Sequence, residues 1–333
     1  MTANRRVLID SLPTGKLTPE NYRLEEASVP EPQEGEVLCR TLAITIGAGT
    51  RAGLQGSASY AGAPKTGVVM NGSAVSRVVA SRHAGVKEGD LVLCGAGWQD
   101  YFACKGESVE VVDDGVDPAH HLGVLGTNGL TAYFGLLKVG EPKAGETVLV
   151  SAAAGSVGHL VGQIAKIQGC QVIGIAGGTA KGDRLVGELG FDAALDYKSD
   201  NFRAEFKSTC ADGVDVYFDN TGGDILGTAL RGMNIGGRIV CCGVVSQYDT
   251  SDPAPGPRGV PGLLVNKRIR MQGFLVFDFA EQYAEARQQL RAWMASGELN
   301  AINDEIDGLE NAPSAFVDLL AGGNVGTRIV RVA

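Results

Sequence analysis

The sequence predicts a two-domain α/β protein, in which a β-rich domain is followed by a doubly wound parallel sheet. Residues 1 to about 125 contain short strand-like runs separated by turn residues, for example EVLCRTLAITI and SAVSRVVAS, as in a compact β domain with a partly closed sheet. From about residue 126 strand-like and helix-like segments alternate, which indicates parallel βαβ units. We therefore expect one domain at residues 1–125, a second at residues 126–297, and a return of residues 298–333 to the first.

The second domain is expected to contain six strands. Five of them are TVLVSA, QVIGIAG, AALDY, VDVYFDNTGG and GRIVCCGVV, with helices between them, and RIRMQGFLVF is the sixth. A long amphipathic helix should follow in FAEQYAEARQQLRAWMASGEL, where Phe279, Tyr283, Leu290 and Trp293 share one face. The Pro/Gly-rich run at residues 252–262 predicts a loop after a strand, which either covers a ligand site or is a plain connector.

The run SAAAGSVG at residues 151–158 lies between the apolar segment ETVLV and the helix-like segment HLVGQIAKIQG. A strand, a glycine turn and a helix in this order let the backbone approach a pyrophosphate at a helix N-terminus. The usual G-x-G-x-x-G pattern becomes Ala153, Gly155 and Gly158, with Ser156 and Val157 inside the turn. The motif predicts a dinucleotide-binding site; the alternative is a tight turn with a structural role only.

The second strand of this domain indicates which dinucleotide is bound. In an NAD site an acidic residue near the end of that strand binds the ribose 2′-hydroxyl. Here the strand ends in Gly177 and Gly178, and Lys181 and Arg184 follow on the next helix. The lack of a carboxylate and the two cations favour the 2′-phosphate of NADPH, unless both cations are simply solvated helix residues.

Composition and charge limit the possible classes of function. The net charge of −9 argues against nucleic acid or an anionic membrane as the main partner. No apolar run reaches the roughly 18 residues of a membrane span, and the N-terminus lacks the apolar core of a signal peptide. The cytoplasm is therefore the expected location.

The seven cysteines and four histidines predict neither a disulfide framework nor a metal site. The number of cysteines is odd, they are scattered, and no C-x-x-C or comparable grouping of ligands occurs. Cys241 and Cys242 are expected to pack in a buried strand, and His120 and His121 are expected to end a loop. We therefore expect chemistry that does not depend on a metal.

Several motifs together resemble the zinc-free medium-chain dehydrogenases/reductases. They are the long run GLTAYFGLLKVGEPKAGETVLVSAAAGSVGHLVGQIAKIQGCQVIGIAGG, then LGFDAALDYKSDNF, VDVYFDNTGG and GLENAPSAF. Within that superfamily the sequence is most similar to the branch of curcumin, 2-alkenal and prostaglandin reductases, over nearly the whole chain. The resemblance implies a GroES-like first domain, a Rossmann second domain, a homodimer, and NADPH-dependent reduction of the C=C bond of a small-molecule enone or enal.

The resemblance also implies roles for individual residues. Lys181 and Tyr197 would contact the 2′-phosphate of NADPH. The other residues that would line the cofactor are Thr131, Gly177, Asn220, Cys242, Gly243, Ser246, Tyr248, Phe274, Leu275, Val276 and Asn324.

The sequence departs from this branch on the substrate side. Ile46 to Arg51 replace an Asp-Pro-x-Met-Arg-type segment that commonly carries a tyrosine, and Thr127-Asn128 replace Met-Pro. Tyr60 in SASYAGAP is then the expected donor of a hydrogen bond to the developing enolate oxygen, unless a ribose hydroxyl of the cofactor is the donor and Tyr60 only packs over the cleft. The departures leave open an imine or carbonyl substrate in a biosynthetic pathway, and also a non-catalytic protein that binds NADPH.

Overall fold

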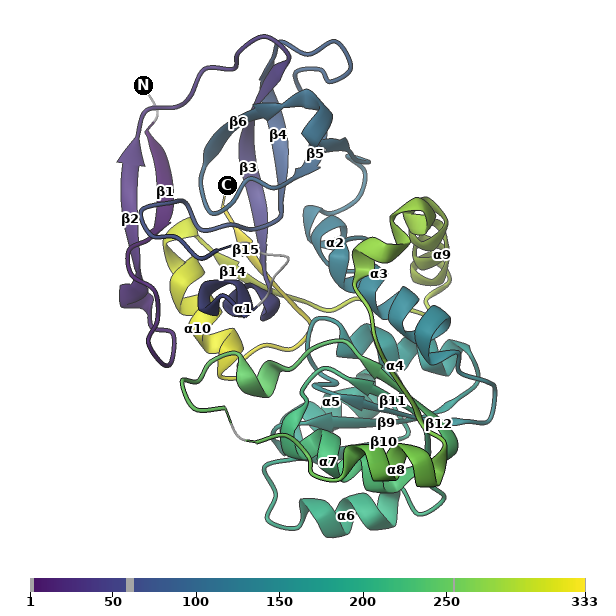
Figure 1. Cartoon of the computed structure of the whole chain (residues 1–333). Coiled ribbons are helices and arrows are strands. Elements are labelled where there is room, and N and C mark those ends of the chain that lie inside the picture. Colours follow the sequence, from purple (N-terminus) through teal and green to yellow (C-terminus); the bar gives the residue numbers. More distant parts are fainter. Residues whose placement is uncertain (1–2, 58–62, 254, 333) are drawn as a thin grey trace. The chain divides into compact units, whose positions relative to one another are not determined.

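The chain divides into two compact units, which are described separately below. The computed structural model describes residues 3–57, 63–253 and 255–332. One unit consists of Met1–Gly126 with Asn303–Ala333, and the other consists of Thr127–Ile302 (Figure 1). Tyr60, the expected hydrogen-bond donor, lies outside the described residues.

The first unit contains a seven-stranded sheet with the order β14-β15-β3-β4-β5-β7, and β6 pairs with β3 outside this path. Strand β15 runs antiparallel to β3, so a strand from the C-terminal segment completes a sheet that begins near the N-terminus. A hairpin of β1 and β2 forms a second, two-stranded sheet. The strands are β1 Asn4–Ile9, β2 Tyr22–Ala27, β3 Glu36–Ile46, β4 Ala74–Ser81, β5 Leu91–Cys94, β6 Tyr101–Lys105, β7 Glu110–Val111, β14 Asn303–Asp307 and β15 Thr327–Arg331.

The core of the first unit lies between these strands and helix α10. Val37 and Ile44 of β3 are fully buried, and they share one apolar cluster with Trp98 and with Phe316 of α10. The rings of Trp98 and Phe316 meet edge to face, with their centroids 6.0 Å apart. The helices are α1 Gly49–Gln55, α2 Pro118–Leu122 and α10 Ala312–Leu320, with 3₁₀ turns at Pro19–Asn21, Gly106–Ser108 and Leu309–Asn311.

The second unit is built on a six-stranded sheet with the order β10-β9-β8-β11-β12-β13. Strand β8 pairs in parallel with β9 on one side and with β11 on the other. The doubly wound parallel sheet that the alternating segments predict is therefore confirmed. The strands are β8 Thr147–Ser151, β9 Gln171–Ala176, β10 Ala193–Asp196, β11 Val214–Asp219, β12 Met233–Cys241 and β13 Arg270–Gly273.

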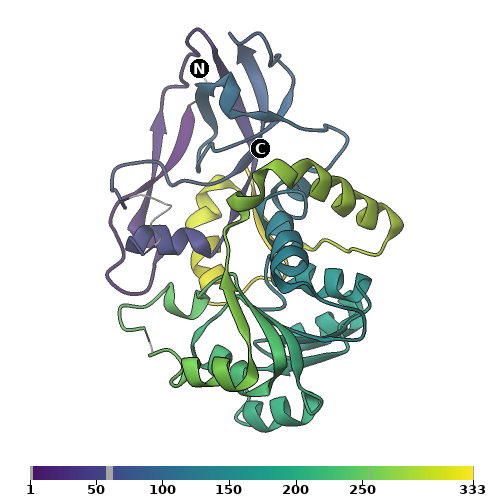
Figure 2. The ribbon, with the colours of Figure 1, turned by 45° about the vertical axis from the view of Figure 1, so that its right-hand side comes forward.

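Helices cover both faces of this parallel sheet (Figures 1 and 2). On one face, Leu149 and Tyr217 of the strands pack with Phe206 of α6 and Leu230 of α7, and the intervening strand residues point to the other face. In the described ranges, no helix combines the length and the hydropathy that a membrane span requires. The helices are α3 Thr127–Phe134, α4 Gly158–Ile167, α5 Thr179–Leu189, α6 Phe202–Thr209, α7 Gly223–Gly232, α8 Val260–Lys267 and α9 Tyr283–Ser296, with a π-helical turn at Gly135–Gly140 and 3₁₀ segments at Val245–Gln247 and Val276–Gln282.

Three local predictions were wrong. The run at residues 252–262 is not a loop throughout, because α8 begins at Val260 with a proline in its first turn, where proline is tolerated. The long helix was expected to include Phe279, but α9 begins at Tyr283, since Phe279 has non-helical backbone angles in the preceding 3₁₀ segment. The two adjacent histidines lie in helix α2 and do not end a loop.

Candidate cofactor site

Nearly all the predicted cofactor contacts of the second unit follow the carboxyl ends of its parallel strands. The glycine turn follows β8, Gly177 and Lys181 follow β9, and Tyr197 follows β10. Asn220 follows β11, the segment 242–248 follows β12, and a last group follows β13. The carboxyl ends of parallel strands share one edge of a sheet. The strand order reverses between β8 and β11, so this edge contains the switch point at which open α/β sheets bind ligands.

Close backbone contacts shape the glycine turn between β8 and α4. Ala152 has a left-handed conformation with a φ of 47°, and Gly155 donates its N–H to the Ala152 carbonyl at 2.9 Å. A Cβ at Gly158 would lie 2.3 Å from that carbonyl oxygen, so only glycine fits where α4 begins. Ala153 is fully buried, and its N–H donates to the Ile175 carbonyl of β9 at 3.0 Å. The turn is thus held against the neighbouring strand.

The start of α4 has the features that a pyrophosphate requires. Ser156 and Val157 are only half-buried, and no side chain in the described part of the chain caps the helix at Val157. The first N–H groups of a helix lack intrahelical acceptors, and the helix dipole favours an anion at that end. The tight turn and the uncapped helix end together fit the pyrophosphate group of a dinucleotide.

The end of β9 packs closely against the residues that follow β10. A Cβ at Gly177 would lie 3.0 Å from both Tyr197 Cε1 and Lys198 Cε. The Lys198 ammonium lies 5.9 Å from the centroid of the Tyr197 ring. Asp196, which was not predicted, accepts N–H hydrogen bonds from Gly178 and Lys198 at 2.9 Å each. These bonds lower the pKa of its carboxyl group. In the sequence, only its position just before Tyr197 in the LDYKS motif could have indicated that Asp196 belongs to the site.

Lys181 and Arg184 have different surroundings on α5. Lys181 is half-buried in the first turn of the helix, which starts after Gly178. Arg184 pairs with Glu188 one turn further on, at 2.9 Å. Arg184 is thus held along the helix surface, as a solvated helix cation would be. Lys181 stands at the end of the helix where an anion is favoured.

At the switch point, Asn220 is held by the last residue of β8. The Asn220 side-chain amide donates to the Ser151 carbonyl at 2.8 Å, and the Asn220 N–H donates to Ser151 Oγ at 3.0 Å. Asp219, only 2% exposed, accepts at Oδ1 from the Tyr217 hydroxyl at 2.7 Å and from the Thr221 N–H at 3.0 Å. Neither Ser151 nor Asp219 was predicted, because the contact between them depends on strand pairing.

The segment after β12 is hydrogen-bonded to the segment after β11. Cys242 and Gly243 donate their N–H groups to the Asp219 carbonyl at 2.9 and 3.2 Å. The Ser246 hydroxyl donates to the Thr221 carbonyl at 2.6 Å. These bonds hold the segment after β12 next to the segment after β11, so the predicted cofactor contacts of the two segments lie side by side at the sheet edge.

In the segment 242–248, the Tyr248 side chain makes a hydrogen bond within the segment, and the Cys242 thiol stays protonated. The Tyr248 hydroxyl accepts the Val244 N–H at 3.3 Å, which closes the segment on itself. Burial, and then the nearby charge of Asp219, raise the pKa of Cys242 to about 12, so its thiol stays protonated. Strand β12 ends at Cys241, Cys242 follows it, and both residues are only half-buried, so the expectation that both pack in a buried strand is wrong.

The predicted contacts after β13 do not share one environment. A Cβ at Gly135 would lie 2.5 Å from Phe274 Cζ, so the Phe274 ring rests on the π-helical turn. Leu275 is 44% exposed, whereas Val276 is 8% exposed and packs into an apolar cluster with residues of α3. Val276 is thus a core residue in this structure. Thr131 is half-buried on α3.

Two residues of interest belong to the first unit. Asn324 is buried, and its side-chain amide donates to the Gly326 carbonyl at 2.8 Å. Arg51, in the segment that departs from the family pattern, is 1% exposed on α1 and donates to the Gly15 carbonyl at 2.6 Å. The departing segment therefore runs from the end of β3 into the first turn of α1, where its arginine is anchored.

The residues that commonly bind metals are engaged in other contacts. Among the described residues, no group of three or more His, Cys, Asp or Glu side chains is placed to hold a metal ion. His121 Nε2 lies 2.9 Å from the Asp113 carbonyl oxygen. His159 Nδ1 lies 2.9 Å from the Gly155 carbonyl oxygen, and its Nε2 accepts the Ile302 N–H at 3.2 Å. That the chemistry needs no metal stays a prediction.

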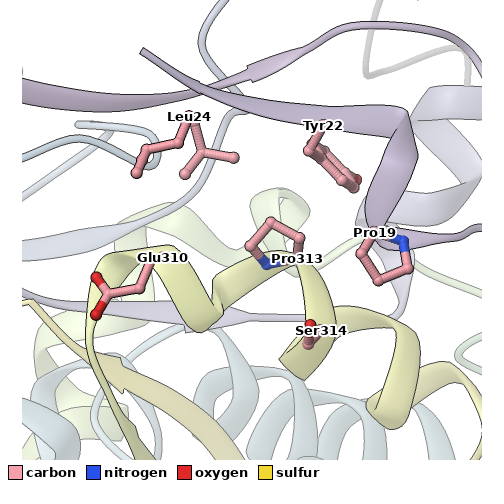
Figure 3. Close-up of a pocket in the computed structure, with 7 residues that line it drawn as sticks. Pro19, Tyr22, Leu24, Glu310, Pro313 and Ser314 are labelled. Atoms are coloured by element: carbon pink, nitrogen blue, oxygen red, sulfur yellow. The ribbon is translucent and has the colours of Figure 1, made fainter. Parts of the chain in front are cut away.

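A cavity of about 190 Å³ lies within the first unit, between the β1–β2 hairpin and α10 (Figure 3). The Tyr22 hydroxyl is buried there without a hydrogen-bond partner in the described part of the chain, and Glu310 pairs with Arg5 at 3.0 Å. No predicted site residue lines this cavity, so it is separate from the candidate cofactor site. Its lining residues are Val7, Pro19, Tyr22, Leu24, Glu310, Pro313 and Ser314.

Comparisons with known proteins cover both units. Residues 5–112 match the family model described as the N-terminal domain of oxidoreductase, and residues 156–292 match the model described as zinc-binding dehydrogenase. The NADPH-dependent curcumin reductase of Escherichia coli (strain K12) is 42% identical over 335 residues, which cover 99% of this chain and 97% of that protein. Prostaglandin reductase 1 of Bos taurus is 38% identical over 324 residues, with 95% of each chain covered.

A solved structure extends the likeness to the fold. CurA from Vibrio vulnificus, in complex with NADPH, has a TM-score of 0.95 and 39% sequence identity, and the match covers 99% of both chains. The sequence motifs, the parallel sheet and these relatives agree. The chain belongs to the medium-chain dehydrogenase/reductase superfamily, in the branch of curcumin, prostaglandin and alkenal reductases.

Proposed function

We propose that this protein is an NADPH-dependent reductase of the C=C bond in α,β-unsaturated ketones and aldehydes. One observation supports the cofactor part of this proposal: residues predicted to contact the cofactor follow the carboxyl ends of all six strands of the parallel sheet, which contains the switch point. The substrate class rests on the relatives, whose names state the reduction of curcumin, prostaglandin and alkenals.

In this proposal the two units have different roles. Residues 126–297 bind NADPH, with the pyrophosphate at the start of α4 and the 2′-phosphate between Lys181 and Tyr197. Residues 1–125 and 298–333 bind the substrate. They include Asn324, which the family resemblance implies as a cofactor contact. The pairing of β15 with β3 supports the assignment of the C-terminal residues to the first domain.

The chemistry needs little acid–base machinery. NADPH, when bound, would supply a hydride for the β-carbon of the substrate and become NADP⁺, and the α-carbon would then take a proton from solvent. The chain has to position that carbon and donate a hydrogen bond to the carbonyl oxygen, where negative charge develops. Tyr60 is the side chain that we propose as this donor, because the tyrosine usual in the segment 46–51 is absent.

The proposal is tested by following NADPH oxidation with a panel of enones and enals, before and after exhaustive chelation. We expect turnover with NADPH that chelation does not abolish.

Tyr60→Phe should lower turnover roughly 100- to 1000-fold, the usual effect of losing one oxyanion donor, while the dissociation constant of NADPH stays nearly unchanged.

Each arm of this experiment can fail separately. Tight NADPH binding without turnover on any substrate would contradict the reductase proposal and favour a non-catalytic NADPH-binding protein. Turnover of imines or saturated carbonyls alone would mean that the substrates are these compounds and not α,β-unsaturated ketones and aldehydes. Tyr60→Phe turnover within about twofold of wild type would leave a ribose hydroxyl of the cofactor as the better donor. Activity that disappears with a stoichiometric bound zinc would overturn metal independence.

We further propose that the protein is a homodimer in the cytoplasm. The edge strand β13 supports the dimer, since Arg270, Gln272 and Gly273 are exposed and Phe277 beyond the strand is 63% exposed. All seven cysteines are free thiols, which suits a reducing compartment.

A further inference from the structure

We propose that Asp219, acting through Ser151, is the positioning residue that fixes the nicotinamide side of the cofactor site. The inference rests on the proposed binding of NADPH at the carboxyl edge of the sheet. Asp219 and Ser151 are the last residues of β11 and β8, the two adjacent strands at the switch point. They stand next to the predicted cofactor contact Asn220 and are themselves buried.

One carboxylate oxygen of Asp219 gathers an unusual number of donors. Besides the Tyr217 hydroxyl and the Thr221 N–H, Oδ1 accepts from the Gly222 N–H at 2.9 Å, from Ser151 Oγ at 3.3 Å and from Thr221 Oγ1 at 3.3 Å. All of these donors are neutral groups. A buried carboxylate is stabilised when such donors are already oriented toward it. The carboxylate in turn fixes the turn that leads from β11 into α7.

The Ser151 hydroxyl connects this carboxylate to the backbone N–H of Asn220. Ser151 Oγ donates to Asp219 and accepts the Asn220 N–H at 3.0 Å, while the Ser151 carbonyl accepts the Asn220 side-chain amide at 2.8 Å. The Asn220 backbone is therefore tied to Asp219 through the Ser151 hydroxyl, and the Asn220 side-chain amide is held by the backbone carbonyl of the same serine. Gly222, with a φ of 67°, lets the chain turn over Asp219 at this point.

The same strand offers a matched control. Asp215 lies near the other end of β11 and also joins neighbouring strands, since it accepts the Thr147 N–H of β8 at 2.9 Å and the Asn234 side-chain amide of β12 at 2.8 Å. Its contacts are at the amino edge of the sheet, away from the predicted cofactor contacts. Asp215→Asn therefore reports what an aspartate in this strand contributes to folding alone.

The test measures the dissociation constants of two probes with the full chain. NADPH spans the whole proposed site, whereas adenosine 2′,5′-bisphosphate lacks the nicotinamide half and occupies only the part near Lys181, Tyr197 and the start of α4. We expect Asp219→Asn to raise the dissociation constant of NADPH about tenfold or more, because hydrogen bonds to a charged acceptor are replaced by weaker ones. The constant for adenosine 2′,5′-bisphosphate should stay within about twofold of wild type. Asp215→Asn should change neither constant by more than that.

Ser151→Ala keeps the inference testable if Asp219→Asn does not fold. It leaves the carboxylate in place and removes only the hydroxyl that connects it to Asn220, so it should also weaken NADPH selectively. Equal weakening of both probes by Asp219→Asn or Ser151→Ala would mean a merely structural role and would overturn the inference. Unchanged NADPH binding in these variants would overturn it as well. If the wild type binds neither probe, the proposed function fails and this inference fails with it.

Discussion

At the scale of single residues, a cation that follows β9 either binds the 2′-phosphate of NADPH or is simply a solvated helix residue. Lys181 fits the first interpretation and Arg184 fits the second. Both lie on α5, three positions apart in the sequence. Arg184 is engaged by Glu188, and an exposed pair of this kind contributes only a few tenths of a kcal/mol. Lys181 lies in the first turn, where a cation opposes the helix dipole unless an anion binds there. A bound 2′-phosphate would supply that anion.

Lys181→Ala should therefore raise the dissociation constant of NADPH roughly ten- to hundredfold, since one charged hydrogen bond is lost. The constant for NADH, which has no 2′-phosphate, should hardly change. Arg184→Ala is the control, and we expect NADPH binding to stay within about twofold of wild type. Both constants can be measured from the fluorescence of the reduced cofactors. A wild-type protein that binds NADPH and NADH equally well would contradict the assignment.

The two aspartates at the sheet edge show which parts of the site were not predictable. The glycine turn and Asn220 could be found because each belongs to a local motif. Asp196 and Asp219 act on residues that are distant in sequence: Asp196 binds the Gly178 N–H, and Asp219 accepts from Ser151. Those pairs form only through the order of the parallel strands, which no spacing in the sequence reveals.

At the scale of elements, apolar content explains which strands could be predicted. Strand β8 is fully buried along its length and β3 largely so, and both ranges were found as apolar runs. The β1–β2 hairpin was missed because β2 reads YRLEEA and exposes half of its residues. Helix α8 was missed because it begins inside a Pro/Gly-rich run and buries none of its residues fully. Strands with apolar runs were thus predictable, and elements at the surface were not.

Helix α4 has a second role besides its start near the glycine turn. His159 bonds the Gly155 carbonyl and accepts the Ile302 N–H. One turn later, Gln163 exchanges two hydrogen bonds with Asn300, at 2.9 and 2.7 Å. The helix therefore holds the last residues of the second unit. Burial lowers the pKa of His159 to about 4, so the ring is neutral at ordinary pH.

This neutral histidine predicts a loss of stability in acid. The unfolded chain binds a proton at His159 below a pH of about 6.5, while the folded chain does so only below about 4. Stability should therefore fall as the pH drops through this window, by up to about 3 kcal/mol from this group. Urea unfolding of wild type and His159→Gln at several pH values checks this.

The variant should be the less stable protein at pH 7.5, and the gap should narrow toward pH 4.5. Gln163→Leu is the control, because it removes bonds to the same segment without removing a titratable group. Its stability curve should run parallel to that of the wild type. If the His159→Gln curve also runs parallel to the wild type, the shift of this pKa is not present in solution.

At the scale of the whole molecule, the two edges of the parallel sheet are unequal. All four residues of β10 are at least half-buried, whereas three of the four residues of β13 are exposed. Exposed apolar side chains flank β13 in the sequence, with Val265 at 74%, Phe277 at 63% and Leu275 at 44% exposure. An unpaired edge strand with apolar neighbours is a surface on which a second copy can add its own strand. A pairing of β13 with its counterpart would be symmetric, as dimers usually are.

Phe277→Asp should therefore convert the proposed dimer to a monomer, because a charge would be buried beside the two paired edge strands. Val186→Asp is the matched control. Val186 is also a large exposed apolar residue, at 45%, but it lies on α5, which packs against β9 and β10 at the opposite end of the sheet. Light scattering after size-exclusion chromatography gives the mass of each variant, against 34.6 kDa for one chain. A wild-type protein that elutes as a monomer would refute the dimer. A Phe277→Asp variant that stays dimeric beside a monomeric Val186→Asp would place the interface at the β10 edge.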